Sequence, residues 1–175
     1  MRRLFVAVWP PEDVLDSVAA LPRPEVEGLR WTDRDQWHVT LRFLGPVPEV
    51  DPVVEALAGV APVRATTAVL GPALDRLGRR ILHVPVNGLD EVAASVVART
   101  SPLGKQPEDR PFHGHVTLAR VAKRARVDLR ALTGTPVDAT WDVDSICLVE
   151  SRLHPAGARY QVLERFSLTP PRPNR

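Results

Sequence analysis

His38-Val39-Thr40-Leu41 and His115-Val116-Thr117-Leu118 are two copies of one tetrapeptide, one in each half of the chain. With five histidines in the whole sequence, a chance repeat of this kind is rare. In a strand, neighbouring side chains point to opposite faces, so each copy would put His and Thr on one face and Val and Leu on the other. The repeat therefore predicts two similar lobes whose polar strand faces meet in one cleft.

The pattern around the repeat favours an α+β fold with a mostly antiparallel sheet. Strands are expected at 4–9, 37–44, 63–70, 80–86, 116–121, 137–143, 145–151 and 159–168, and helices at 11–21, 51–60, 89–100 and, briefly, 128–132. This order is neither a strict βαβ alternation nor an all-β meander. We expect residues 1–169 to form a single bilobal domain, followed by a disordered tail at 170–175.

Composition excludes several classes of protein. The chain has 175 residues, a net charge of +2 and one cysteine, Cys147, which excludes an intramolecular disulfide framework and a zinc ribbon. No apolar run reaches the length of a membrane span, so we expect a cytoplasmic protein. All but two of the 23 basic residues are arginines, which permits a phosphate-bearing partner without requiring one. Cys147 is expected in a core strand.

The repeated His and Thr side chains suit acid–base chemistry on a phosphate. Two imidazoles in one cleft can serve as a general base and a general acid, because both titrate near neutral pH. The hydroxyl hydrogens of Thr40 and Thr117 can turn toward anionic oxygens.

Other interpretations of the histidines stay open. His83, His113 and His154 are expected to be structural or surface residues. His113-Gly114-His115 puts two imidazoles on one strand face, which is a possible metal-chelating pair, although the sequence offers no third ligand nearby. We expect no metal and no cofactor. A non-catalytic RNA- or nucleotide-binding module is the alternative from another functional class.

With these residues in place, the sequence resembles the two-histidine phosphoesterases and, among them, the LigT-like RNA 2′,3′-cyclic phosphodiesterases. The resemblance covers nearly the whole chain. It is carried by Arg3-Leu4-Phe5-Val6-Ala7-Val8 before Pro10-Pro11, by Trp37-His38-Val39-Thr40-Leu41-Arg42-Phe43-Leu44-Gly45, by Phe112-His113-Gly114-His115-Val116-Thr117-Leu118-Ala119-Arg120, and by Glu150-Ser151-Arg152-Leu153 with Gly157, Tyr160 and Phe166. Gly114 is a departure, because the family commonly has Pro there, and we expect it to loosen the start of the strand.

The resemblance implies a bilobal fold of two pseudo-symmetric, mostly antiparallel sheets with outer helices and a central cleft. It implies that His38 is the proton donor and His115 the proton acceptor in hydrolysis of RNA or nucleoside 2′,3′-cyclic phosphates to 2′-phosphates. In some relatives the reaction also runs backwards as 2′–5′ RNA ligation. Thr40 and Thr117 would hold the phosphate.

Three further residues are weaker candidates for substrate binding. Arg120 would face away from the cleft in a regular strand, and would reach the phosphate only if the strand twists or bulges. Phe43 and Arg42 are candidates for lining a base pocket, where an aromatic ring would stack on a base without reading sequence. The expected partner is RNA with a 2′,3′-cyclic phosphate end or a small cyclic nucleotide, bound by a monomer. Another small cyclic phosphate is the alternative substrate.

Overall fold

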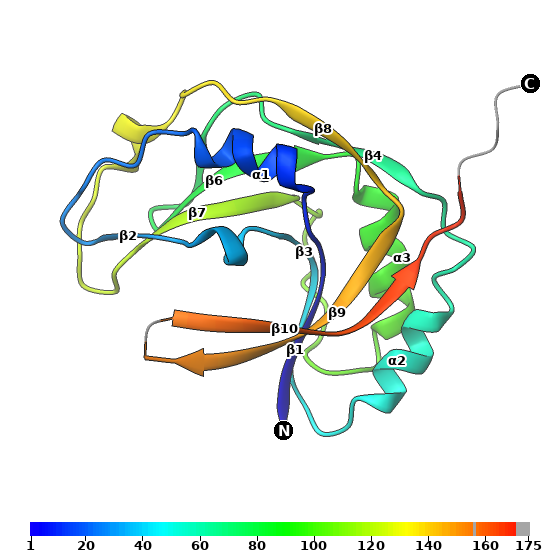
Figure 1. Ribbon diagram of the computed structural model, residues 1–175. Coiled ribbons are helices and arrows are strands. Elements are labelled where there is room, and N and C mark those ends of the chain that lie inside the picture. Colours follow the sequence, from blue (N-terminus) through cyan, green and yellow to red (C-terminus); the bar gives the residue numbers. More distant parts are fainter. Residues whose placement is uncertain (156, 171–175) are drawn as a thin grey trace, which may run out of the picture.

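The computed structural model describes residues 1–155 and 157–170, in which ten strands form one curled antiparallel sheet with three α-helices (Figure 1). The strands are β1 (Arg2–Val8), β2 (Leu29–Trp31), β3 (Val39–Val47), β4 (Thr66–Leu70), β5 (Asp75–Leu77), β6 (Ile81–Asn87), β7 (His115–Val121), β8 (Ala139–Val143), β9 (Ser145–His154) and β10 (Gly157–Ser167). The helices are α1 (Glu12–Ala19), α2 (Asp51–Ala58) and α3 (Asp90–Thr100), with short 3-10 turns η1 (Arg34–Gln36) and η2 (Leu129–Leu132). The predicted α+β class is confirmed. Of the predicted tail, residues 171–175 lie outside the described residues.

The two copies of the tetrapeptide lie on neighbouring strands in the middle of the sheet. The strand order is β10-β9-β1-β3-β7-β6-β4-β8, so β3 ends one half and β7 begins the other. A single register pair, Val39 opposite Val116, joins them. The two expected sheets are therefore continuous, and their junction runs through the repeat itself.

From Leu4 to Val8, strand β1 is apolar because both of its faces are covered. On one face, Leu4, Val6 and Val8 belong to the main core. On the other, Phe5 and Ala7 belong to a second, smaller apolar cluster that also contains the buried Cys147 and Val149 of β9. The prediction that Cys147 lies in a core strand is confirmed.

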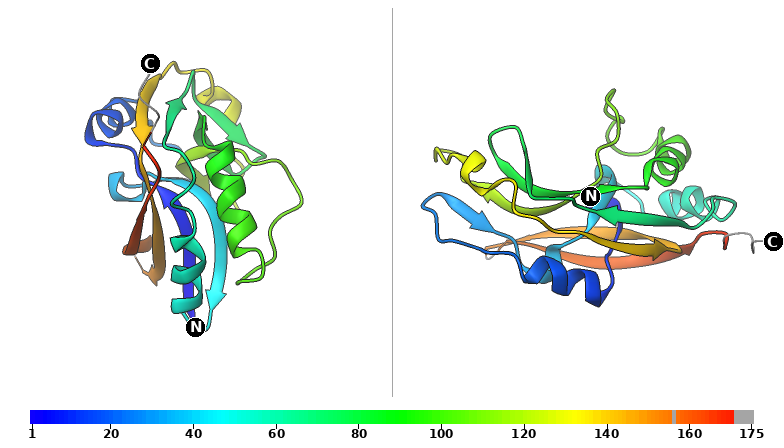
Figure 2. Two further views of the ribbon diagram at one scale, coloured as in Figure 1. Left: turned by 90° about the vertical axis from the view of Figure 1, so that its right-hand side faces the viewer. Right: turned by 90° about the horizontal axis from the view of Figure 1, so that it is seen from above.

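The helices form where the sequence places their signals. Helix α1 begins directly after Pro11, has two acidic residues in its first turn, and buries Val14, Leu15 and Val18. Helices α2 and α3 pack against each other, and α3 also packs against β3. Figure 2 shows α1 apart from this pair. None of the helices in the described residues has the length and apolar character that crossing a membrane requires.

Strands β2 and β5 were not predicted. Each has only three residues, too few for an alternating pattern to be recognisable. They extend the sheet by pairing with β7 and β6 respectively. Arg30 of β2 thereby comes next to Arg120, two residues after the second copy of the repeat.

A β-bulge follows the first copy of the tetrapeptide. Thr40 and Arg42 of β3 pair with consecutive residues of β1, which leaves Leu41 as the extra residue. An extra residue reverses the alternation of the strand. Leu41 and Arg42 are consequently both buried, and Phe43 returns to the face that carries His38 and Thr40.

An equivalent bulge follows the second copy. Thr117 and Ala119 of β7 pair with consecutive residues of β6, so Leu118 is the extra residue. Leu118 and Ala119 are both buried, and Arg120 is exposed on the face that carries Thr117. The condition under which Arg120 was expected to reach the cleft is thus met, by a bulge at the position equivalent to that in β3.

Candidate active site

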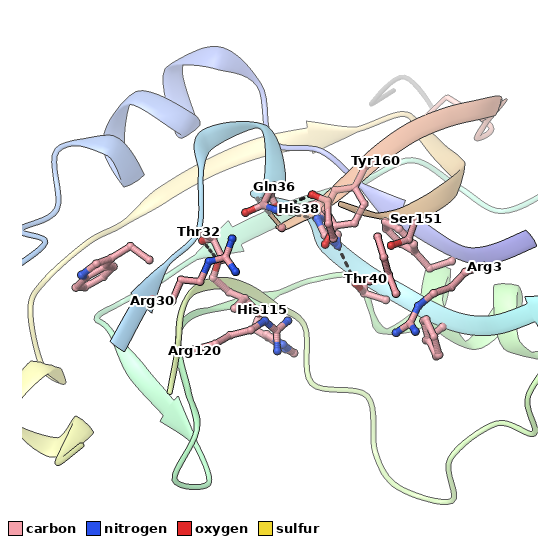
Figure 3. A pocket seen from close by; sticks show the side chains of 17 residues that line it. Arg3, Arg30, Thr32, Gln36, His38, Thr40, His115, Arg120, Ser151 and Tyr160 are labelled. Atoms are coloured by element: carbon pink, nitrogen blue, oxygen red, sulfur yellow. Dashed lines mark hydrogen bonds between the residues drawn. The ribbon is translucent and has the colours of Figure 1, made fainter. Parts of the chain in front are cut away.

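One cavity of about 430 Å³ is lined by His38, Thr40, His115 and Thr117 together (Figure 3). These are the four polar side chains that the repeat predicts to converge, and the structure brings them together. The single register pair Val39–Val116 holds the two copies side by side at this cavity.

The two rings are held by the same kind of hydrogen bond. Nδ1 of His38 donates to the carbonyl oxygen of Gln36 at 2.7 Å, and Nδ1 of His115 donates to that of His113 at 2.8 Å. Because a carbonyl oxygen only accepts, each neutral ring carries its hydrogen on Nδ1 and has its lone pair on Nε2. Nε2 of His38 lies 3.1 Å from Oγ1 of Thr40, which donates to it. Both rings are thus prepared to exchange a proton through Nε2.

His38 lies in an aromatic surround. The ring centroids of Phe5, Trp9 and Tyr160 are 4.9, 5.1 and 5.0 Å from that of His38, with Trp9 stacked and Tyr160 edge-on. Burial among these rings lowers the pKa of His38 to about 4. The nearby positive charge of Arg120 lowers this pKa further, and the Gln36 carbonyl partly opposes the shift. His38 is therefore neutral in the free protein at neutral pH.

His115 has a different neighbour. The ring of His83 meets it edge-on at 5.2 Å between centroids. His83 is only 5% exposed, and neither of its ring nitrogens has a hydrogen-bond partner among the described residues. Burial lowers the pKa of His83 to about 4 and also lowers the pKa of His115, with Arg120 adding to the latter shift. The buried, neutral imidazole of His83 thus packs edge-on against the ring of His115.

The cavity is cationic. Arg3, Arg30 and Arg120 line it, and none of its lining residues in the described part of the chain is Asp or Glu. Arg30 pairs with Arg120 across β2 and β7, so the two side chains share one face. The guanidinium of Arg3 lies 4.8 Å from the ring centroid of Phe43. Such a cavity favours an anionic ligand.

The structure gives no support to the metal alternative. Within residues 1–155 and 157–170, no three His, Cys, Asp or Glu side chains come together in a way that could hold a metal ion. Among the residues that the structure describes, the His113–His115 pair therefore has no third His, Cys, Asp or Glu beside it. The backbone carbonyl of His113 has a different use, as the acceptor for His115.

Gly114 lies where β6 and β7 approach each other closely; whether it loosens the strand compared with Pro stays a prediction. A Cβ at this position would lie 2.4 Å from the carbonyl oxygen of Val86 and 3.2 Å from the ring of Phe112. The N–H of Val86 donates to the carbonyl of Gly114 at 2.8 Å. The absent side chain lets β6 approach β7 closely, immediately before His115.

Of the two residues predicted to line a base pocket, Phe43 lies in the cavity and is 39% exposed. The prediction for Arg42 is wrong. The bulge turns Arg42 to the opposite face, where it is 5% exposed and donates to the carbonyls of Val97, Leu103 and Lys105 and to the hydroxyl of Thr100. Arg42 ties β3 to the end of α3 and cannot touch a ligand in the cavity.

Sequence reasoning missed the surroundings of His38. Phe5 and Trp9 lie two strand positions on either side of Ala7, so a period-2 pattern was present in β1. The continuous apolar run concealed it. Tyr160 and Arg30 come from β10 and β2, which only the tertiary fold brings to the cavity.

Comparisons with known proteins agree with this geometry. Residues 10–155 match the family model described as "2'-5' RNA ligase superfamily". A curated Escherichia coli protein, "RNA 2',3'-cyclic phosphodiesterase", is 30% identical over 96% of this chain and 97% of its own length. A protein with the same description from Geobacillus stearothermophilus is 31% identical over 79% of this chain, which spans 47% of that protein. The crystal structure of E. coli LigT complexed with 3'-AMP is 26% identical, has a TM-score of 0.74, and is matched over 96% of this chain and 98% of its own.

The neighbours Arg42 and Phe43 provide a matched pair of variants. Arg42→Met removes the donor to three half-buried carbonyls and to the buried hydroxyl of Thr100, so we expect it to lower the free energy of unfolding by about 2–4 kcal/mol. Phe43→Ala, on the exposed face, is expected to lower it by less than about 1 kcal/mol. Urea denaturation measures both. Equal stability of the two variants would contradict the structural role assigned to Arg42.

Proposed function

The chain belongs to the 2'-5' RNA ligase superfamily, and we propose that it hydrolyses RNA 2′,3′-cyclic phosphate ends to 2′-phosphomonoesters. One observation carries the proposal. Two imidazoles, each held through Nδ1 by a carbonyl two residues upstream, line one cationic cavity together with two threonines. This arrangement suits a single phosphorus atom attacked from one side and released on the other.

In the proposed reaction His115 is the base and His38 the acid. Nε2 of His115 takes a proton from a water molecule as its oxygen forms a bond to phosphorus. The bond between phosphorus and the ribose O3′ breaks, and Nε2–H of protonated His38 gives its proton to that oxygen. The phosphate stays on O2′, and transfer of a proton from His115 to His38 through solvent restores the starting state. No proton is gained or lost on the two histidines over a full cycle.

The bound phosphodiester supplies a negative charge, which the lining of the free cavity lacks. His38 is neutral in the free protein because it is buried and lies near Arg120. A phosphodiester anion placed between the histidines favours the charged form of each and raises both pKa values. The substrate thereby promotes the protonation of His38 that its own cleavage requires. Thr40 and Thr117 donate to the non-bridging oxygens, and Arg120 balances their charge.

The nucleoside would occupy the part of the cavity that Phe43 and Arg3 line. The ring of Phe43 is partly exposed, and the guanidinium of Arg3 lies over it. An exposed aromatic ring can stack on a base whatever the identity of that base. The 3'-AMP complex of E. coli LigT supports a nucleotide ligand for this chain. The proposal places the protein in the cytoplasm, as a monomer.

Removal of either imidazole tests the proposal. His38→Ala and His115→Ala are each expected to lower kcat for a nucleoside 2′,3′-cyclic phosphate by about 10²–10⁴-fold, because general acid and general base are lost separately. Initial rates at saturating substrate, with circular dichroism to verify folding, provide the measurement. The control is His113→Gln, an exposed histidine two residues from His115.

We expect the control to stay close to the wild-type rate. A loss of activity in His113→Gln that a divalent ion restores would support the metal alternative instead. Binding of a cyclic phosphate without turnover by the wild-type protein would support the non-catalytic binding module.

The pKa shifts predict how the rate depends on pH. In the free protein the pKa values of His38 and His115 both lie below 6.5, so the maximum of kcat/KM is expected below pH 6.5. The bound phosphodiester raises both values, so the maximum of kcat is expected at a higher pH than that of kcat/KM. Michaelis parameters measured from about pH 4.5 to 8.5 provide the test. Coincident maxima, or rates independent of pH, would show that these imidazoles do not exchange the protons.

A further inference from the structure

A second cavity, of about 720 Å³, lies beyond the end of β7. It is formed by the turn between β5 and β6 and by the segment 123–130 that leads from β7 into η2. Figure 1 shows this segment in yellow-green and yellow at the left end of the molecule. Seven of the twelve residues that line the cavity are Arg or Lys, and one, Asp128, is acidic. Below, these residues are called the basic cavity.

The cations of the basic cavity are not neutralised by ion pairs within the described residues. Arg80 donates to the carbonyls of Ala122 and Lys123, and Arg76 donates to that of Gly78, so these side chains hold the loops through neutral groups. Asp128 accepts the backbone N–H of Arg130. None of the ion pairs found among residues 1–155 and 157–170 includes an Arg or Lys of the basic cavity.

The charges of the basic cavity are contributed by three separate segments of the chain. They come from the β5–β6 turn, from the segment after β7 and from η2. Several cations that make no ion pair within the described residues, presented by separate segments, suit the repeated phosphates of a nucleic-acid strand. Among its described lining residues the basic cavity has no aromatic side chain on which a base could stack.

The basic cavity is connected to the active site through β7. This strand carries His115 and Arg120 and ends at Val121, two residues before Lys123. The Cα atoms of Arg120 and Lys123 are at most about 11 Å apart along the chain. Arg76 pairs with Leu82, and Leu82 pairs with Ala119, so Arg76 is on the face opposite Arg120. An RNA strand that touches both sites passes around the end of β7.

We propose that the basic cavity binds the phosphodiester backbone of the RNA whose cyclic phosphate end occupies the active site, several nucleotides away from that end. This inference rests on the proposed function and extends it, because it makes an RNA chain a better substrate than a mononucleotide. Contacts made by Arg and Lys to phosphates alone give an affinity that is independent of sequence and sensitive to salt.

The test compares two substrates with one double variant. Arg124 and Arg126 are exposed lining residues whose side chains make no hydrogen bond or ion pair in the described part of the chain. In Arg124→Glu/Arg126→Glu, kcat/KM for a single-stranded oligoribonucleotide with a 2′,3′-cyclic phosphate end is expected to fall about tenfold at low salt, mainly through KM. Turnover of adenosine 2′,3′-cyclic phosphate is expected to stay within about twofold of wild type.

The salt dependence gives a second readout. For single-stranded nucleic acid, each phosphate contact adds about 0.7 to the slope of log affinity against log salt, so loss of two contacts should make the slope shallower by about 1.4. The matched control is Arg64→Glu/Arg99→Glu, which makes the same change of charge at two exposed positions outside the basic cavity. We expect the control to keep both the rate and the slope.

The outcomes separate this inference from the proposed function. An equal loss with the control variant, or an equal loss with adenosine 2′,3′-cyclic phosphate, would overturn the inference and leave the proposed function intact. Binding of a 3′-hydroxyl RNA of the same sequence, followed by fluorescence anisotropy, needs no turnover. It tests the basic cavity even if no cyclic phosphate is hydrolysed, and competition by polyglutamate as effective as that by RNA would overturn the assignment to RNA.

Discussion

The pairing of Val39 with Val116 is the contact on which the site depends, because it joins the two halves of the sheet through the repeat. Two strands from different halves of the chain become neighbours there, and their apolar residues lock both to the main core. Their polar residues consequently share one face and one cavity. The lining residues come from both halves of the sheet, so the candidate active site forms only when β3 and β7 lie together.

The two identical tetrapeptides have different surroundings in the folded protein. His38 is enclosed by aromatic rings from β1 and β10 and from the residue that follows β1, whereas His115 rests against the buried imidazole of His83. An acid and a base that work in one reaction must differ in proton affinity at the moment of transfer. The repeat supplies two identical groups, and the non-repeated residues around them supply the difference.

Sequence could predict the part of the site that depends on local alternation. The four His and Thr side chains follow from the repeat and the pleat of a strand, and the α+β class follows from the order of apolar segments. The bulges at Leu41 and Leu118 could not be predicted, because a bulge is fixed by the register of the neighbouring strand. For this reason Arg42 was placed in the cavity wrongly, while Arg120 was placed there only on the condition of a bulge. The aromatic surround of His38 combines β1 and β10, and the alternation of Phe5 and Trp9 is hidden within a continuous apolar run.

Nitrogen-15 NMR of the imidazoles tests the central claim most directly. At about pH 7 and without ligand, the rings of His38 and His115 should both be neutral, with hydrogen on Nδ1 and no hydrogen on Nε2. Addition of a nucleoside 2′-monophosphate, the proposed product, should move both Nε2 resonances toward those of a protonated ring and raise both pKa values. A response from one ring alone, or from neither, would show that the two imidazoles do not flank a common phosphate.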